Sequence, residues 1–144
     1  MGNVFTTERR VEFCETDAAG IVHFSSFLCY MEQAEHAFLR SNGQSVVQPV
    51  TEGGHVSWPR VKVECHYFSP ARFEEILKIS MQITRLGSKS VTYQFTFTSA
   101  VDTLIARGEV VAACCHVMNH GEAIHSIEIP EQFRTIMTPY ICSK

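Results

Sequence analysis

Long apolar runs are missing from this 144-residue sequence, so no segment is expected to span a membrane. Residues 1–10 also lack the apolar core of a signal peptide, which predicts a cytoplasmic protein with no membrane partner. An excess of basic charge is missing too, because the formal net charge is −3, and no nucleic-acid partner is expected. Repeats and low-complexity stretches are absent, and 45% of residues are hydrophobic against 19% charged. These values predict one globular domain over residues 1–144.

Several motifs of metal and covalent chemistry are absent as well. The six cysteines include no C-x-x-C pair, so we expect reduced, mostly buried thiols rather than a disulfide framework. The sequence has no H-E-x-x-H motif, and His116 and His120 lie four apart near a strand end rather than on a helix. It also has no G-x-S-x-G motif, which argues against a serine hydrolase. No metal site is predicted.

The most informative stretch joins a short turn to an amphipathic helix. Asp17 lies in a turn that ends at Gly20. Beyond it, four apolar residues recur at helical spacing, namely Phe27, Met31, Ala34 and Phe38. Ser25 or Ser26 is expected to cap a helix of about nineteen residues that ends at Gly43. The N–H groups of a helix N-terminus carry partial positive charge, so a carboxylate beside them suits acyl transfer.

Five other segments alternate apolar and polar residues as strands do: 5–13, 61–68, 77–84, 91–98 and 104–118. The last is apolar on both faces near its end, which predicts a central position in a sheet or burial in an interface. Short connections between the later strands predict antiparallel hairpins. Residues 44–58 are expected to form a loop. A short helix is expected to begin near Pro130. One long helix with an antiparallel sheet of about five strands is an α+β fold. The sheet surface that one helix leaves uncovered predicts a homo-oligomer.

These segments resemble a known family, the hotdog-fold acyl-CoA thioesterases of the 4-hydroxybenzoyl-CoA thioesterase and Tol–Pal-associated types. The most specific match is Glu-Thr-Asp-Ala-Ala-Gly-Ile-Val-His-Phe followed by Phe-Leu-x-Tyr-Met-Glu-x-Ala. The resemblance continues in Val-Glu-Cys-His-Tyr-Phe-Ser-Pro-Ala-Arg-Phe-Glu-Glu-Ile-Leu, in Gly-Ser-Lys-Ser and in Ile-Glu-Ile-Pro-Glu-Gln-Phe. It implies a curved antiparallel sheet wrapped around one long central helix. It also implies hydrolysis of an acyl-CoA, no cofactor beyond the CoA of the substrate, and dimers or tetramers with active sites between subunits.

Two catalytic residues follow from the resemblance. Asp17 matches the catalytic carboxylate of the family, and Phe24 matches the residue whose backbone N–H polarises the thioester carbonyl. Relatives carry Tyr, Trp or His around positions 23 and 24, so the phenylalanine at 24 transfers only its backbone role. His23 is expected to line the acyl pocket, and an imidazole there is also suited to proton transfer. The simpler interpretation of Asp17 is a turn aspartate that accepts local backbone hydrogen bonds.

The resemblance also implies residues that bind substrate. Glu32 and Trp58 match positions that line the acyl pocket of relatives, although Glu32 and His36 have the spacing of a local helix pair. The turn between the third and fourth strands matches a segment that contacts the CoA phosphates, and the residues expected to bind there are Arg85, Ser88, Lys89 and Ser90. Cationic side chains suit phosphate binding, but hairpin charges are also commonly solvated.

Two rival functions share this fold. A hotdog domain can bind an acyl thioester without turning it over, or serve as an assembly module. A hydratase or dehydratase is a third possibility, but these enzymes resemble a different motif, with an Asp/His pair on one segment, which this sequence does not contain. The sequence also leaves open whether Asp17 attacks the thioester as a nucleophile or activates water as a general base.

Overall fold

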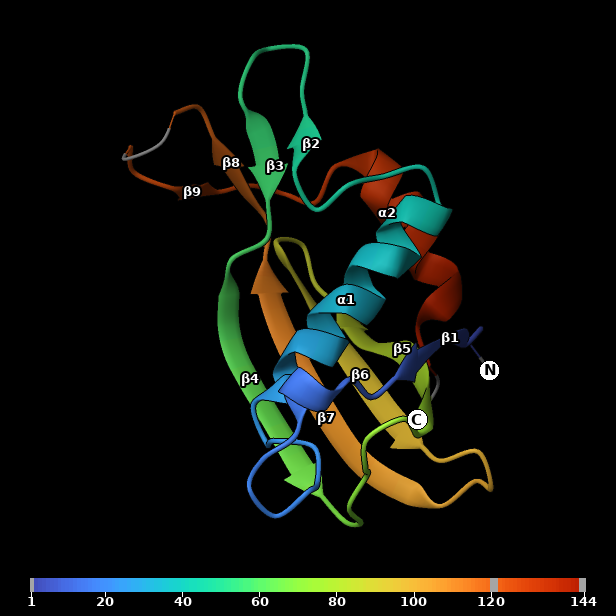
Figure 1. Cartoon of the computed structure of the whole chain (residues 1–144). Coiled ribbons are helices and arrows are strands. Elements are labelled where there is room, and N and C mark those ends of the chain that lie inside the picture. Colours follow the sequence, from blue (N-terminus) through green and yellow to red (C-terminus); the bar gives the residue numbers. More distant parts are fainter. Residues whose placement is uncertain (1, 120–121, 143–144) are drawn as a thin grey trace.

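A five-stranded antiparallel sheet forms the base of the structure, a computed structural model that describes residues 2–119 and 122–142 (Figure 1). The strand order is β1-β5-β6-β7-β4, with bounds Phe5–Arg10 (β1), Ile76–Leu86 (β5), Ser90–Thr98 (β6), Leu104–Ala113 (β7) and Arg60–Tyr67 (β4). Alternate side chains of β5 and β6 are buried, and Met81 lies opposite Phe95 in the register. All five predicted strands are present. The last predicted segment is divided at Cys114, beyond which Cys115–Val117 (β8) joins a different sheet.

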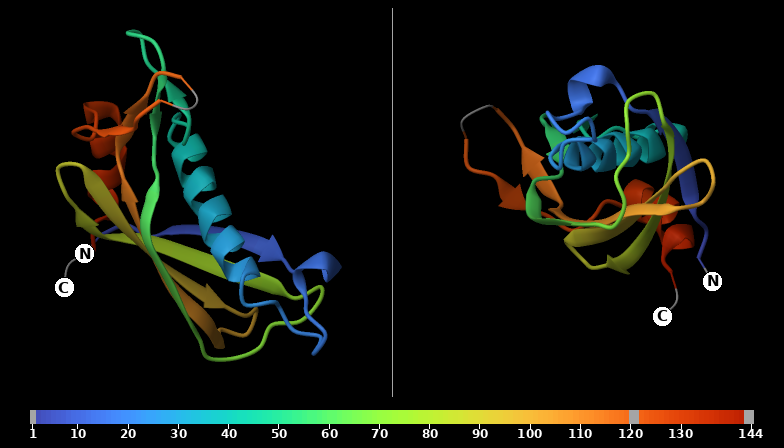
Figure 2. Two further views of the ribbon diagram at one scale, coloured as in Figure 1. Left: turned by 90° about the vertical axis from the view of Figure 1, so that its left-hand side faces the viewer. Right: turned by 60° about the horizontal axis from the view of Figure 1, so that its bottom comes forward.

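Helix α1, Ser26–Ser41, lies across the concave face of this sheet, which curves around it (Figure 2). The predicted apolar stripe is confirmed, because Phe27, Met31, Ala34 and Phe38 are all buried. The helix has 16 residues rather than about nineteen, since it ends before Asn42 and Gly43 takes a φ of +76°. At the other end, Ser25 occupies the N-cap position, but its hydroxyl bonds to His23 rather than to a helix N–H.

A second antiparallel sheet projects from one end of the molecule (Figure 1). Its order is β2-β3-β8-β9, and its other strands are Gln48–Pro49 (β2), His55–Ser57 (β3) and His125–Ser126 (β9). The prediction of a loop over residues 44–58 therefore holds only in part, because β2 and β3 lie within it and are too short for an alternating pattern to be visible. Helix α2, Glu131–Met137, follows Pro130 as predicted. The fold is α+β, with two sheets and two α-helices among the described residues.

The cysteines are unpaired thiols. Cys114 and Cys115 are buried, as expected, but Cys14 and Cys29 are exposed, so the prediction of mostly buried thiols holds only in part. Within residues 2–119 and 122–142, no three His, Cys, Asp or Glu side chains are grouped so that they hold a metal ion. No helix in the same ranges is long and apolar enough to cross a membrane.

Candidate active site

Asp17 lies in a tight turn between the 3-10 helix Phe13–Glu15 (η1) and helix α1. Its Oδ1 accepts hydrogen bonds from the backbone N–H groups of Ala19 (2.8 Å) and Ile21 (3.4 Å). The turn closes at Gly20, whose φ of +79° is a conformation that favours glycine. In the part of the chain that the structure describes, no hydrogen bond reaches Asp17 Oδ2. One carboxylate oxygen therefore builds the turn, and the other is available to a ligand.

Glu15 fastens this turn to the helix. Its carbonyl oxygen accepts hydrogen bonds from the His23 N–H (2.9 Å) and the Ser26 hydroxyl (3.0 Å). Its carboxylate pairs with Arg9 and accepts a hydrogen bond from the Tyr30 hydroxyl (2.9 Å). Burial raises the pKa of Glu15, but hydrogen bonds from the Glu12 N–H, Tyr30 and Arg9 outweigh it and leave the pKa below its ordinary value. Glu15 is therefore held as an anion two residues before Asp17.

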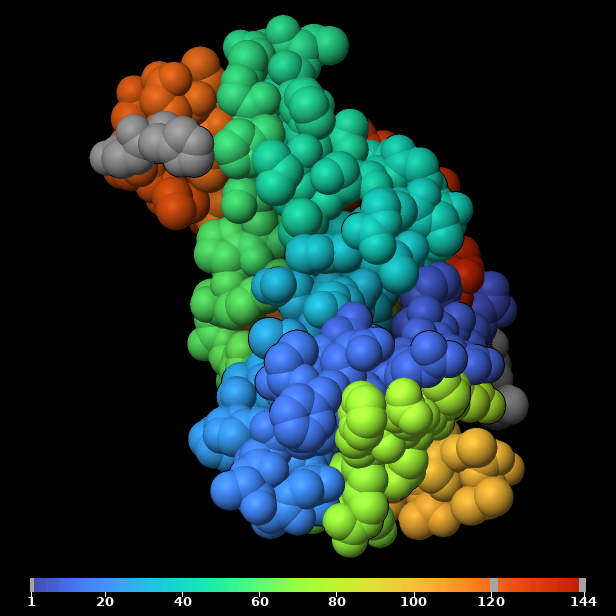
Figure 3. All heavy atoms as spheres, in the orientation of Figure 1, coloured from blue at the N-terminus to red at the C-terminus, as the bar shows by residue number. Residues whose placement is uncertain are grey.

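A pocket opens beside the turn. Residues 21 and 22 pack against the segment after β4, where the Val22 N–H donates to Ala71 O (2.8 Å) and Ile21 forms an isolated bridge with Arg72. The two segments lie side by side at the lower end of the molecule in Figure 3. The pocket has a volume of about 430 Å³ and is lined by Asp17, Ile21, Val22, Phe24, Tyr67, Phe68, Ser69 and Pro70. The two predicted catalytic residues are thus brought to one cavity.

Phe24 immediately precedes the helix N-cap. Its ring is 65% exposed, and its backbone N–H donates to no other group of the described chain. Its carbonyl oxygen accepts a hydrogen bond from the Tyr67 hydroxyl at 2.9 Å. Tyr67 was not predicted as a site residue. The only signal for it in the sequence is a tyrosine at the end of a strand, just before Ser69-Pro70.

His23 is not among the residues that line this pocket, so the prediction that it lines an acyl pocket is not supported within one chain. Its Nδ1 lies 2.8 Å from Ser25 Oγ and accepts the Ser25 N–H at 3.2 Å. The His23 ring stacks on the Phe24 ring with centroids 4.4 Å apart. His23 therefore shapes the loop before the helix.

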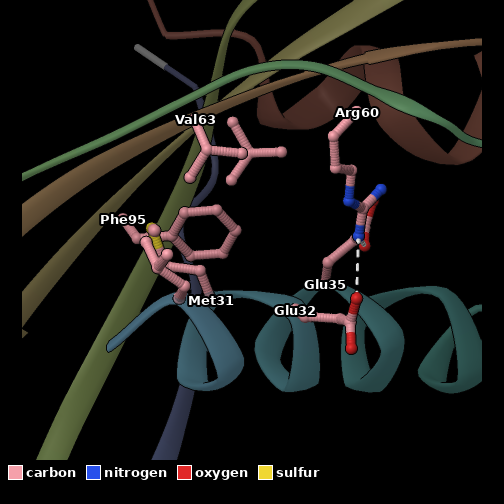
Figure 4. Close-up of a pocket in the computed structure, with 8 residues that line it drawn as sticks. Met31, Glu32, Glu35, Arg60, Val63 and Phe95 are labelled. Carbon is pink, nitrogen blue, oxygen red and sulfur yellow. Dashed lines mark hydrogen bonds and ion pairs between the residues drawn. The ribbon is translucent and has the colours of Figure 1, made fainter. Parts of the chain in front are cut away.

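Glu32 on α1 and Trp58, between β3 and β4, lie away from the Asp17 pocket. Both line a cavity of about 310 Å³, and Glu32 also lines a smaller one of about 140 Å³ between α1 and β4 (Figure 4). Trp58 is 4% exposed and packs edge-on to Phe133. Neither residue lines the Asp17 pocket, so their role as an acyl pocket for Asp17 of the same chain is not supported. The expected Glu32–His36 pair is replaced, since Glu32 faces Arg60 at 3.8 Å and His36 faces Glu35 at 3.6 Å.

Arg60, whose side chain is 24% exposed, forms an ion pair with the buried Glu35 at this place (Figure 4). Both guanidinium nitrogens reach the carboxylate, and Arg60 Nη1 also donates to Trp58 O at 3.0 Å. Glu35 is 1% exposed, and burial raises its pKa even though the hydrogen bonds from Arg60 lower it. The pair fastens the middle of α1 to the edge strand β4.

The predicted phosphate-binding residues lie on the turn between β5 and β6 and on the strand ends that flank it. Arg85, Ser88 and Lys89 are exposed, and Ser90 is half-buried. Arg134 of α2 reaches the same turn and donates to Gly87 O at 2.8 Å, a third cation that sequence reasoning missed. Because β5 has eleven residues and spans about 36 Å, this turn lies a strand length from the Asp17 end of its own chain. One chain therefore does not join its predicted phosphate site to its predicted catalytic site.

Comparison with known proteins defines the class. A family model described as the thioesterase-like superfamily matches residues 11–135, and the chain belongs to this superfamily. Among individual relatives, the acyl-CoA thioester hydrolase YbgC of Escherichia coli O6:H1 is 30% identical over 105 residues, which cover 73% of this chain and 77% of the relative.

Two further comparisons extend the similarity over the whole domain. The 4-hydroxybenzoyl-CoA thioesterase of Pseudomonas sp. (strain CBS-3) is 25% identical over 138 residues, covering 92% of this chain and 96% of the relative. The crystal structure of a 1,4-dihydroxy-2-naphthoyl-CoA thioesterase from Synechocystis covers 94% of this chain and 96% of that chain, with a TM-score of 0.79 and 24% identity. The last similarity establishes the shared fold.

Proposed function

We propose that this protein hydrolyses an acyl-CoA thioester to a free acid and CoA, with no cofactor beyond the CoA of the substrate. The observation that carries the proposal is the Asp17 pocket, where a carboxylate oxygen without a partner and the Phe24 residue with an unused N–H meet in one cavity. Membership of the thioesterase-like superfamily and the names of its relatives as acyl-CoA hydrolases support the same chemistry.

In the first step, the Phe24 N–H donates to the thioester carbonyl oxygen and stabilises the negative charge that develops on it. Asp17 Oδ2 attacks the carbonyl carbon, the C–S bond breaks, and CoA leaves as the thiolate. The product is a mixed anhydride between the acyl group and Asp17. We favour direct attack over general-base catalysis because the residues that line the pocket include no second base to support Asp17 in activating water.

In the second step, water attacks the Asp17 carboxyl carbon of the anhydride. The Oδ1 atom on this carbon already accepts the N–H groups of Ala19 and Ile21, so it is polarised like a carbonyl in an oxyanion hole. The acid then leaves with the former Oδ2, and Asp17 regains a water oxygen. One proton of that water protonates the CoA thiolate, and the other protonates the carboxylate of the released acid.

We further propose that two copies pair to complete the site. The strand β4 is the edge of the five-stranded sheet, yet Val61 is 65% and Val63 41% exposed on it. Exposed edge strands with apolar side chains favour pairing with another strand. Antiparallel pairing of β4 with itself would bring the Asp17 end of one copy beside the β5–β6 turn of the other. That arrangement joins catalytic and phosphate-binding residues that one chain keeps apart.

The charges of β4 favour one register for this pairing. Centred on Val63, it places Lys62 opposite Glu64 of the second copy on both sides of the twofold axis, whereas centring on Lys62 or Glu64 opposes like charges. Lys62→Glu is expected to sediment as a monomer and to have low activity. The double variant Lys62→Glu with Glu64→Lys is expected to restore the dimer. A fully active parent monomer at assay concentration would contradict this part of the proposal.

The experiment for the activity is a thiol-release assay across short, long and aromatic acyl-CoA thioesters. We expect turnover with at least one of them, and the order of kcat/KM identifies the acyl group. The rival function, a domain that binds a thioester without turning it over, predicts saturable binding and no thiol release. The latter result with the whole panel would contradict the proposal.

A further inference from the structure

The first turn of α1 leaves the carbonyl group of Phe24 outside the helix hydrogen-bond pattern. The N–H of Leu28, four residues farther along, donates to Ser25 O at 3.1 Å instead. The hydroxyl of Tyr67 takes the vacant place and donates to Phe24 O at 2.9 Å. Phe24 is 65% exposed and its ring stacks on that of the adjacent His23, so packing does little to fix the residue against the sheet. The hydrogen bond from Tyr67 is therefore a direct tie between the Phe24 backbone and the sheet.

Tyr67 is itself firmly placed. It is the last residue of β4 and lies opposite Ala106 in the register with β7. Its ring packs edge-on to the buried ring of Phe27, with centroids 5.4 Å apart. The next residue, Phe68, donates its N–H to Ile105 O at 2.8 Å, which holds the strand end against its neighbour. A rigid sheet position is thus connected through one hydroxyl to the residue in front of the helix.

We infer that Tyr67 is a positioning residue, which fixes the Phe24 N–H where the oxyanion of an acyl thioester develops. The inference rests on the proposed function and adds to it the group that holds its oxyanion donor. Tyr67 lines the Asp17 pocket, but its hydroxyl is directed to the Phe24 carbonyl, so its effect on the substrate passes through Phe24. Burial and then the neighbouring Cys65 raise the pKa of Tyr67 to about 12, so the hydroxyl keeps its proton, and its hydrogen bond, at neutral pH.

The expected loss of kcat can be estimated from the effect of removing an oxyanion donor altogether. Removing such a donor lowers kcat by about 10²–10³. Loss of Tyr67 would loosen the donor without removing it, so a smaller loss of about tenfold is expected. The loss should fall on kcat, because the interaction strengthens only as negative charge develops.

The test is Tyr67→Phe, which deletes one oxygen atom and keeps the ring that packs on Phe27. We expect kcat to fall about tenfold with KM and the thermal midpoint nearly unchanged. The shape of the pH–rate profile should also stay as in the parent, because Tyr67 is not assigned a proton transfer. Tyr140→Phe is the matched control: Tyr140 packs on Phe38 near the other end of α1, and its variant should keep the parental kcat.

A spectroscopic readout separates positioning from a merely structural role. In an Asp17→Asn background that turns substrate over slowly, the carbonyl stretch of the bound thioester reports how strongly the Phe24 N–H polarises it. Adding Tyr67→Phe should shift this stretch to higher wavenumber. Parental kcat in Tyr67→Phe, a loss confined to KM, or an unshifted stretch overturns the inference and leaves the proposed function standing. Absence of thioester hydrolysis by the parent overturns both.

Discussion

Asp17 and Glu35 are two carboxylates at the same helix, but their hydrogen-bond partners and their exposure differ. Asp17, before the N-terminus of α1, has one oxygen held by two backbone N–H groups and the other open to a pocket of about 430 Å³. Glu35, in the middle of α1, is 1% exposed and has both oxygens paired with Arg60. Both are acidic residues that can carry the same charge, so neither the side-chain chemistry nor the charge explains why their roles differ. The difference lies in whether an oxygen is left without a partner.

The comparison shows how carboxylates near one helix can serve either stability or chemistry. A buried carboxylate whose oxygens are both paired can hold two elements together, but neither oxygen is accessible to a substrate. An incompletely satisfied carboxylate at an open pocket contributes less to stability and can react. On this view, changes at Asp17 should affect turnover, and changes at Arg60 or Glu35 should affect the free energy of unfolding.

The largest effect is expected from Asp17→Asn, which keeps the shape of the side chain and removes its charge. The amide can neither attack the thioester nor deprotonate water, so kcat should fall by about 10²–10⁴. The Oδ1 contacts to Ala19 and Ile21 can persist, so the thermal midpoint and acyl-CoA binding should remain near the parental values. Near-parental kcat would reject the catalytic role. A large loss of thermal stability would instead support the simple turn aspartate.

The second effect is expected from Arg60→Met, which leaves Glu35 buried without its partner. We expect a loss of about 3 kcal/mol in the free energy of unfolding at pH 7, measured by urea denaturation. Glu35→Leu combined with Arg60→Met is the control; it removes both charges and should regain most of the stability and keep most of the turnover. Equal stability of the parent and Arg60→Met would contradict the assignment of a structural role to this pair.

The same variant has a defined dependence on pH. Burial raises the folded-state pKa of Glu35 above its ordinary value of 4.5, and Arg60 opposes that shift. A raised carboxyl pKa lowers stability as pH rises from the unfolded to the folded pKa. Loss of Arg60 raises the folded pKa further, so the cost of Arg60→Met should shrink as pH falls toward 4.5 and Glu35 becomes protonated. A cost that does not vary with pH would contradict this account.

A smaller effect is expected from Lys89→Ala, at the opposite end of the sheet. If Lys89 helps to hold the CoA phosphates, KM for acyl-CoA should rise several-fold with kcat nearly unchanged, since remote binding is lost equally from the ground and transition states. The difference from the parent should shrink at high salt, where the exposed charge is screened. Lys78→Ala, on β5 but toward the other end of the strand, is the matched control. Unchanged KM at low ionic strength would leave Lys89 as a solvated hairpin charge.

The local part of this account could be predicted from the sequence. The period of Phe27, Met31, Ala34 and Phe38 predicts α1, and the turn at Asp17 precedes it as expected. Contacts that depend on distant segments could not be predicted. The Tyr67–Phe24 hydrogen bond joins residues 43 positions apart, and the strands of the second sheet are too short to show a period. The resemblance implied that Glu32 and Trp58 line the acyl pocket, but Glu32 on α1 and Trp58 between β3 and β4 line a cavity that does not include Asp17.

The most direct test of direct attack by Asp17 is a single turnover in ¹⁸O-labelled water, with enzyme in excess over the best acyl-CoA. The account predicts that the acid released first carries an unlabelled oxygen from Asp17, and that the peptide containing Asp17 gains one ¹⁸O atom. Asp17→Asn supplies the control, since it should release almost no acid on this timescale. Acid that carries ¹⁸O from the first turnover, together with an Asp17 peptide that stays unlabelled, would contradict the account, because water would then have attacked the acyl carbon rather than the Asp17 carboxyl carbon.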